Sequence, residues 1–154
     1  DRCVEVGGFK PYVRTNPPLA ELEGLDAKHV DFLCRVAGML PQLKIAETKA
    51  ESLGGGVWRL EATVVNEGEL PTFPEMGDIS KQIQPVQIAI ELPDGASLVT
   101  GYARRRLPTL AGSGGHATET WLVRMPPDAA GKVRVRVWAP GAGNAKKTVR
   151  LGGA

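Results

Sequence analysis

Aromatic side chains and histidines are scarce in this sequence, and their scarcity argues against two classes of function. Aromatic residues make up 5% of the 154 positions, and there are two histidines. Proteins that bind single-stranded nucleic acid stack bases on several aromatic rings, a platform that this chain does not offer. Two histidines leave little room for a catalytic triad, and no G-x-S-x-G elbow is present. We therefore expect neither a nucleic-acid partner nor a serine hydrolase.

Long apolar runs are also missing. No stretch approaches the roughly 18 consecutive apolar residues of a transmembrane helix. No basic segment followed by an apolar stretch marks a signal peptide. The chain opens on Asp1 rather than Met, and Cys3–Val6 reads as a strand already under way. We expect a piece of a longer polypeptide without a membrane span, whose localisation is unknown from these residues.

Residues with metal-ligand spacing are few. Cys3 and Cys34 form no metal motif, which leaves one disulfide or two separate buried thiols as alternatives. His116-Ala-Thr-Glu119 has the H-x-x-E spacing of a zinc site, but in a strand residues three apart face opposite ways. The other histidine, His29, lies in a region of helical pattern. We expect no metal and no cofactor in this chain.

Charge is distributed unevenly although the net charge is +2. After residue 100 there are ten Lys/Arg and two Asp/Glu, a balance of +8; residues 1–100 carry nine and fifteen, a balance of −6, and −6 + 8 = +2. An anionic partner or an acidic neighbour in the same chain would explain the surplus. So would strands that simply turn polar residues outward.

Two segments precede the strands. Residues 1–18 end in Asn16-Pro17-Pro18, which predicts an extended connector. Residues 19–41 predict a helix, because apolar residues recur at three- and four-residue steps. We expect Gly24 to weaken or break it, with Asp26 capping a second piece, and Pro41 to end it.

Residues 42–154 change to a period of two, which predicts strands with one buried and one solvated face. About seven short strands follow, separated by Gly-, Pro- and Asn-rich turns: Leu43–Ala50, Trp58–Val64, Val86–Leu92, Leu98–Arg105, Thr118–Val123, Val133–Val137 and Lys147–Leu151. Glu69–Gln82 is long enough to cross between two sheets. We predict a mainly β fold, an antiparallel sandwich of immunoglobulin- or fibronectin-like type preceded by one or two helices.

Two features of the sandwich suggest binding. Arg104-Arg105-Arg106 would suit phosphate or acidic glycans, and would equally protect a sheet edge from aggregation. Trp58 and Trp121 fall on inward positions. Trp138 falls on the opposite phase from the valines of its strand, where it would contact a sugar or cover the end of the sandwich.

Four segments carry a resemblance to a known family: Val4–Pro11, Val13–Pro18, His29–Pro41 and Val64–Thr72. Together they resemble the C-terminal part of bacterial zinc carboxypeptidases of the carboxypeptidase A-like superfamily. In those enzymes a V-E-[IV]-G-G strand and an N-P-P connector end the catalytic domain, and a helix and a β-sandwich follow.

The resemblance implies that three segments of the chain have different roles. Residues 1–18 would be a remnant of the catalytic domain, 19–41 a linking helix, and 42–154 an accessory sandwich that stabilises or flanks the upstream catalytic domain. Glu5 would be the general base and acid beside Zn²⁺ in the intact enzyme. The zinc ligands match nothing in this chain, so we expect the isolated chain to be inactive.

Two further expectations complete this interpretation. The family suggests a periplasmic or secreted protein, and the N-terminal strand or the helix would allow self-association. The alternative function is a binding module for cell-wall or other anionic polymer, based on the basic C-terminal half and on Trp138.

Overall fold

The computed structural model describes residues 2–4, 7–9, 15, 17–126 and 130–152. Their contacts divide the chain into two compact units, residues 1–38 and 39–154.

The first unit consists mainly of helix α1, Leu19–Gly38. The expected break at Gly24 is wrong, because the helix runs through it; one glycine costs only about 1 kcal/mol relative to alanine. Asp31 and Arg35 form an i,i+4 ion pair at 2.9 Å. The prediction that this helix ends before Pro41 is confirmed, since α1 ends at Gly38.

Exposed apolar side chains follow one another along α1: Leu22, Val30, Phe32, Leu33 and Val36. Their docking on another surface stays a prediction. Of the strand expected at residues 3–6, Cys3 and Val4 adopt no strand, and residues 5–6 lie outside the described residues.

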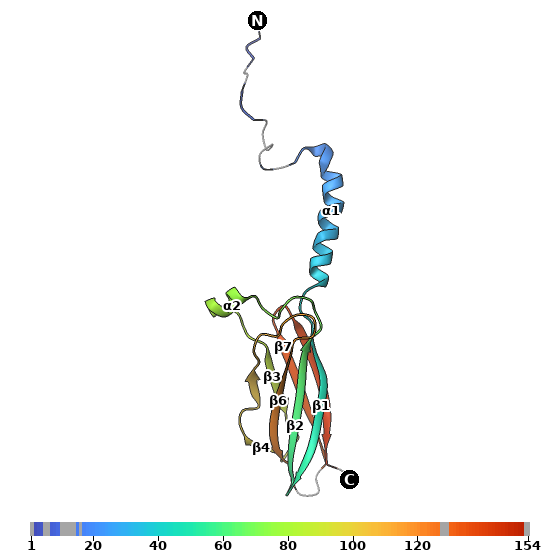
Figure 1. Cartoon of the computed structure of the whole chain (residues 1–154), viewed down its shortest axis with the longest axis vertical. Helices are drawn as coiled ribbons and strands as arrows, with labels where there is room; N and C mark the ends of the chain where they lie inside the picture. The colour runs from blue at the N-terminus through green and yellow to red at the C-terminus, as the bar shows by residue number, and fades with distance from the viewer. Residues whose placement is uncertain (1, 5–6, 10–14, 16, 127–129, 153–154) are drawn as a thin grey trace. The chain divides into compact units, whose positions relative to one another are not determined.

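The second unit is a sandwich of two four-stranded antiparallel sheets (Figure 1). Sheet A has the order β1-β2-β6-β4, and sheet B the order β5-β3-β7-β8. The bounds of the strands are β1 Leu43–Gly54, β2 Val57–Asn66, β3 Gln87–Glu91, β4 Ser97–Thr100, β5 Arg104–Arg106, β6 His116–Arg124, β7 Gly131–Ala139 and β8 Gly143–Leu151. The predicted mainly β, antiparallel sandwich is therefore confirmed.

The structure describes eight strands where about seven were expected, because the segment 98–105 is two strands. β4 pairs with β6 in sheet A, whereas β5 pairs with β3 in sheet B. Gly101, at φ +84°, lies between them in a conformation that L side chains rarely adopt. The connection at 69–82 does cross between the sheets, as predicted, but it also contains a short helix, α2 (Glu75–Ser80), that was not expected.

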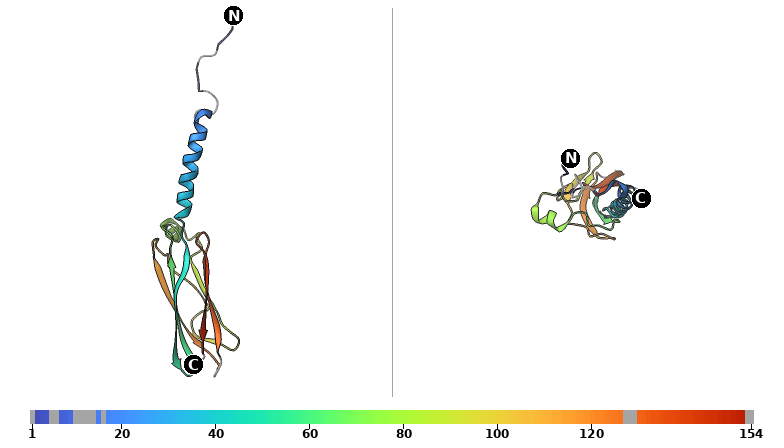
Figure 2. Two further views of the ribbon diagram at one scale, coloured as in Figure 1. Left: turned by 90° about the vertical axis from the view of Figure 1, so that its right-hand side faces the viewer. Right: turned by 90° about the horizontal axis from the view of Figure 1, so that it is seen from above.

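Alternation along the strands fills the space between the two sheets, which face each other in Figure 2. The fully buried side chains come from both sheets: Leu60, Ala62, Val64, Trp121 and Val123 from sheet A, and Ile88, Val133, Val135, Val137 and Leu151 from sheet B. Trp58 packs against this core while partly exposed. The inward positions predicted for Trp58 and Trp121 are confirmed.

A buried asparagine holds the end of the sandwich where β2 leaves sheet A. The side-chain oxygen of Asn66, Oδ1, accepts hydrogen bonds from the backbone N–H groups of Gln42 and Gly68, at 2.9 and 3.1 Å. Its amide donates to the carbonyls of Leu70 and Ala111, at 2.8 and 3.1 Å. Because Asn66 is fully buried, these bonds offset the cost of removing its amide from water.

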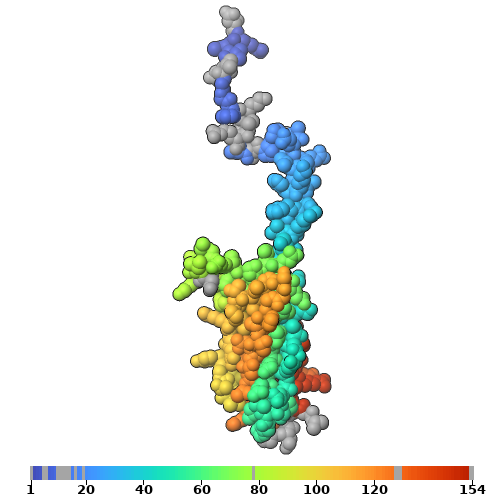
Figure 3. All heavy atoms as spheres, viewed as in Figure 1, coloured from blue at the N-terminus to red at the C-terminus, as the bar shows by residue number. Residues whose placement is uncertain are grey.

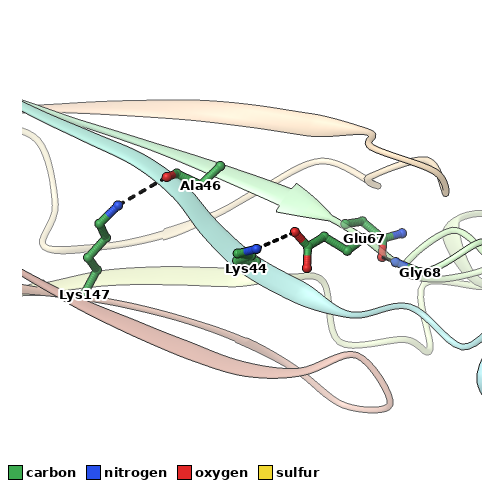
Figure 4. Close-up of polar contacts among 6 residues, drawn as sticks. Lys44, Ala46, Glu67, Gly68 and Lys147 are labelled. Carbon is green, nitrogen blue, oxygen red and sulfur yellow. Dashed lines mark hydrogen bonds and ion pairs between the residues drawn. The ribbon is translucent and has the colours of Figure 1, made fainter.

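The edge between β1 and β8 is joined by polar contacts from both sheets (Figure 4). The Lys147 ammonium donates to the Ala46 carbonyl at 3.2 Å, and the Leu43 N–H donates to the Ala142 carbonyl at 3.0 Å. Lys44 of β1 pairs at 2.7 Å with Glu67, which directly follows β2. The two sheets are thus linked at this edge by main-chain and side-chain bonds as well as by the core.

Candidate anion-binding face

The outward-facing side chains of sheet B form a cationic surface, which we call the basic face. Its residues alternate with the buried ones along the four strands: Arg104 and Arg106 on β5; Gln87, Ala89 and Glu91 on β3; Lys132, Arg134, Arg136 and Trp138 on β7; and Asn144, Lys146, Thr148 and Arg150 on β8. Among these described residues seven are Lys or Arg, and Glu91 is the one carboxylate. The face therefore carries a surplus of positive charge.

Cross-strand register places like charges directly opposite each other between β7 and β8. Arg136 is paired with Lys146, and Lys132 with Arg150. Like charges at opposed positions of an antiparallel pair destabilise a sheet. The face therefore contains two repulsive pairs that an external anion would relieve.

Glu91 partly neutralises the middle of the basic face. It lies opposite Arg134 in the register of β3 and β7, and accepts hydrogen bonds from Arg134 at 2.9 Å and from Arg136 at 3.2 Å. The hydrogen bond from Arg136 lowers the pKa of the Glu91 carboxyl, and the bond and charge of Arg134 act in the same direction. Glu91 is thus ionised at neutral pH and holds two of the seven cations.

Two guanidinium groups lie close to the Trp138 ring. The Arg104 Cζ atom is 4.8 Å from the centroid of the Trp138 ring, and the Arg136 Cζ atom is 5.9 Å from it. Both distances fall in the range of cation–π contacts. Arg104 also donates to the Gln87 side-chain oxygen at 2.5 Å. The indole is half-buried on the outer side of the sheet, which confirms the prediction that its phase differs from that of the valines.

Two shallow hollows lie on the basic face. One, of about 330 Å³, is lined by Arg136, Trp138, Asn144 and Lys146 together with Glu91 and Arg134. The other, of about 600 Å³, is lined by Lys132, Thr148 and Arg150, again with Glu91 and Arg134. Each hollow contains one of the like-charge pairs, and the Glu91–Arg134 pair borders both.

The arginine run 104–106 is divided between two environments. β5 is one of the two edge strands of sheet B, so the edge position considered for these residues is confirmed. Arg104 and Arg106 face outward, whereas Arg105 donates to Glu119 of β6 at 2.8 Å and lies 5.4 Å from the Trp121 ring centroid. Arg105 thereby joins the two sheets and is not available to a ligand in the way that its neighbours are.

The H-x-x-E motif is separated by the pleat, as predicted. His116 is exposed on the outer side of β6, and Glu119 points inward to Arg105. His29 is exposed on α1. In the described part of the chain, no group of three or more His, Cys, Asp or Glu side chains has an arrangement that would hold a metal ion.

The remaining predicted residues lie in the first unit. Glu5, the catalytic candidate, falls outside the described residues. Cys3 and Cys34 are free thiols and both are exposed, so the buried-thiol alternative is wrong.

Sequence reasoning missed most of the basic face. Arg134 and Arg136 were attributed only to strand alternation, and Lys132, Lys146 and Arg150 were not singled out. The charge surplus after residue 100 was the available signal. That surplus does not reveal that β7 pairs with β8, and this pairing brings the cations of the two strands onto one surface.

Comparison with known families covers most of the chain. Residues 42–150 match the family described as Domain of unknown function (DUF8731). The comparison with curated proteins gives no match. None of the helices in the described residues has the length and apolarity required to span a bilayer.

Proposed function

The chain belongs to the DUF8731 family, and we propose that its sandwich is a non-catalytic module that binds an anionic polymer through the basic face. One observation carries this proposal: seven cations, arranged with two like-charge cross-strand pairs, have one carboxylate to balance them. The fold does not need this arrangement, since neutral polar residues at the same outward positions would also be compatible with a solvated sheet face.

A polymer suits the surface better than a compact ligand. The cations are spread over three strands, β5, β7 and β8, and both hollows described above are shallow, so neither hollow encloses a small molecule. Several exposed cations, each contributing a weak contact, bind a chain of anions through summed electrostatic attraction. Such binding weakens with salt, because the Debye length is about 10 Å at 0.1 M.

Binding of a sulfated or uronate polysaccharide at two salt concentrations tests the proposal. We expect measurable affinity at low salt and loss of affinity at high salt. The double variant Lys146→Gln/Arg150→Gln should bind roughly tenfold more weakly, since an exposed ion pair contributes about 0.2–1 kcal/mol. The matched control is Lys49→Gln/Arg59→Gln on sheet A, which removes the same charge and should leave affinity within about twofold. Equal losses in both variants would show that net charge alone matters.

The second proposal is the accessory role beside a zinc carboxypeptidase. It is supported by the sequence resemblance of residues 4–18, 29–41 and 64–72. Residues 64–72 include Asn66 and form the hydrogen-bonded end of the sandwich, so a shared fold would explain why that segment is similar. In this role Zn²⁺ would be held by an upstream domain, with Glu5 as general base and acid.

A peptide-cleavage assay tests the accessory role. The chain by itself should neither bind Zn²⁺ nor cleave a hippuryl peptide. A longer polypeptide that includes the upstream domain should cleave it, and Glu5→Gln should lower kcat by about 10²–10⁴-fold. Full activity in the Glu5→Gln polypeptide would exclude the role assigned to Glu5.

A further inference from the structure

We infer that the basic face contains two anion subsites that a single acidic oligosaccharide bridges; this inference rests on the proposed polymer binding and specifies its ligand. Subsite 1 consists of Arg136 and Lys146 with Trp138 and Asn144. Subsite 2 consists of Lys132 and Arg150 with Thr148. Each subsite coincides with one of the two hollows.

The register fixes the distance between the subsites. Lys132 and Arg136 are four residues apart on β7, and Lys146 and Arg150 are four residues apart on β8. A strand rises about 3.3 Å per residue, so the two like-charge pairs lie about 13 Å apart. Within each pair the two residues are neighbours across the strands, with Cβ atoms about 5 Å apart. A single anionic group can therefore contact both cations of one subsite but not those of the other.

Glu91 explains why there are two subsites and not one continuous track. It lies between the hollows, borders both and holds Arg134 and Arg136 in ion pairs. An anion at the centre of the face would meet the negative carboxylate at close range. The bound ligand should therefore place its anionic groups at the two ends and a neutral unit over Glu91.

The uncharged residues of the subsites identify the ligand as a carbohydrate. Trp138 offers an apolar ring flanked by cations, Asn144 an amide, and Thr148 a hydroxyl. An indole with neighbouring hydrogen-bonding groups suits a sugar ring and its hydroxyls. A nucleic-acid strand would need successive stacking rings, and Trp138 is the one aromatic residue among the described residues of this face. An acidic polysaccharide that alternates charged and neutral sugars meets these requirements.

Size-defined oligosaccharides of alternating glucuronate and N-acetylglucosamine provide the test, with affinity measured by titration calorimetry. The disaccharide carries one carboxylate and should reach one subsite. Hexasaccharide and longer oligomers carry enough carboxylates to reach both. We expect a gain of more than tenfold on passing from disaccharide to the longest oligomer, because the second contact becomes intramolecular.

Two single variants separate the subsites. Lys146→Gln and Arg150→Gln should each remove most of the length dependence while changing disaccharide affinity by no more than a few fold. Arg59→Gln on sheet A is the control and should leave the length dependence intact.

The failures of the two proposals are distinguishable. If no length of this polymer and no sulfated polysaccharide binds, the proposed polymer binding is wrong. If the polymer binds but disaccharide and long oligomers bind equally per carboxylate, the two-subsite inference is wrong and polymer binding stands. Tighter binding of single-stranded nucleic acid than of any acidic polysaccharide would overturn the assignment of the ligand as a carbohydrate.

Discussion

Both sheets are four-stranded and antiparallel, but the charges on their outer faces differ: they are balanced on sheet A and mostly positive on sheet B. Figure 3 views the molecule from the side of sheet A. On the outer face of this sheet Lys49 pairs with Glu47 and Arg59 with Glu51, and at its end Lys44 pairs with Glu67, which follows β2. On sheet B, Glu91 is the one carboxylate among the described outward residues and pairs with two of the seven cations, and cations oppose cations across β7 and β8.

The contrast shows which charges the fold requires. Both sheets bury every second residue and both are solvated on the outside, so a balanced outer face is sufficient for folding. The surplus on sheet B adds repulsion without adding core contacts, and a feature that opposes stability is best explained by binding. Substitutions on one face at a time leave the other face as the control.

The largest effect should come from giving sheet B the charge balance of sheet A. In the double variant Lys132→Glu/Lys146→Glu, each like-charge pair becomes an opposite-charge pair. We expect affinity for an acidic polysaccharide to fall by about 100-fold or more, since each subsite loses a cation and gains an anion. Stability against urea should stay equal or rise.

The mirror variant, Glu47→Lys/Glu61→Lys, gives sheet A a surplus of cations. Combining it with Lys132→Glu/Lys146→Glu on sheet B gives a fourfold variant in which the cation surplus has moved from sheet B to sheet A. If the geometry of the two hollows matters, this fourfold variant should bind the polysaccharide more weakly than the native chain does. Recovery of full affinity in the fourfold variant would reduce the comparison to net charge alone.

The next largest effect concerns Arg105, the arginine of the 104–106 run that faces the interior. Arg105→Ala should lower the free energy of unfolding by about 1–3 kcal/mol, because it removes the partner of the partly buried Glu119 and the contact with Trp121. Arg104→Ala, on the outside, should lower it by less than about 0.5 kcal/mol. Urea unfolding of both variants measures the difference, and equal losses would mean that Arg105 does not join the sheets.

The run 104–106 also shows how far sequence reasoning reaches. Period-two alternation predicted the strands, the sandwich and the outward phase of Trp138, because which side chains are buried depends on local pattern. The split of 98–105 into β4 and β5 was missed, since whether a strand continues or crosses to the other sheet depends on its partners. Arg105 looked equivalent to its neighbours because Glu119, its partner, comes from a different sheet.

The basic face was hidden for the same reason. Arg134 and Arg136 are visible as outward positions of one strand, but repulsion with Lys146 and its neighbours exists only once β8 is paired in register with β7. Charge surplus is a property of composition, whereas a site requires the topology. The helix illustrates the converse case, since its end before Pro41 depends on nearby residues and was predicted correctly.

A smaller effect on stability, of opposite sign on the two faces, should follow when one cation on each face is replaced by threonine. Arg150→Thr removes a cation that opposes Lys132, and should stabilise the sandwich by about 0.2–1 kcal/mol. Lys49→Thr removes a cation paired with Glu47, and should destabilise it by up to about 1 kcal/mol. Thermal unfolding at low ionic strength measures both. Two shifts of the same sign would contradict the contrast between the faces.

The smallest effect concerns the titration of Glu91. Its pKa is lowered in the folded protein, chiefly by the hydrogen bond from Arg136. A depressed folded-state pKa means that Glu91 contributes stability above its unfolded pKa, and that this contribution is lost as the pH falls through the folded value. An NMR titration should show the Glu91 carboxyl protonating below the ordinary range of glutamate, and Glu91→Gln should flatten that part of the stability profile.

Protonation of Glu91 should act on binding in the opposite direction to its effect on stability. Neutral Glu91 releases Arg134 and Arg136 and no longer repels an anion at the centre of the basic face. Affinity for a sulfated polysaccharide, whose charges persist in acid, should therefore rise as the pH falls through the Glu91 titration, and Glu91→Gln should show the higher affinity already at neutral pH. Glu61→Gln on sheet A should show neither effect. If Glu91→Gln binds no better than the native chain at neutral pH, Glu91 does not compete with the ligand, and the division of the face into two subsites would need another cause.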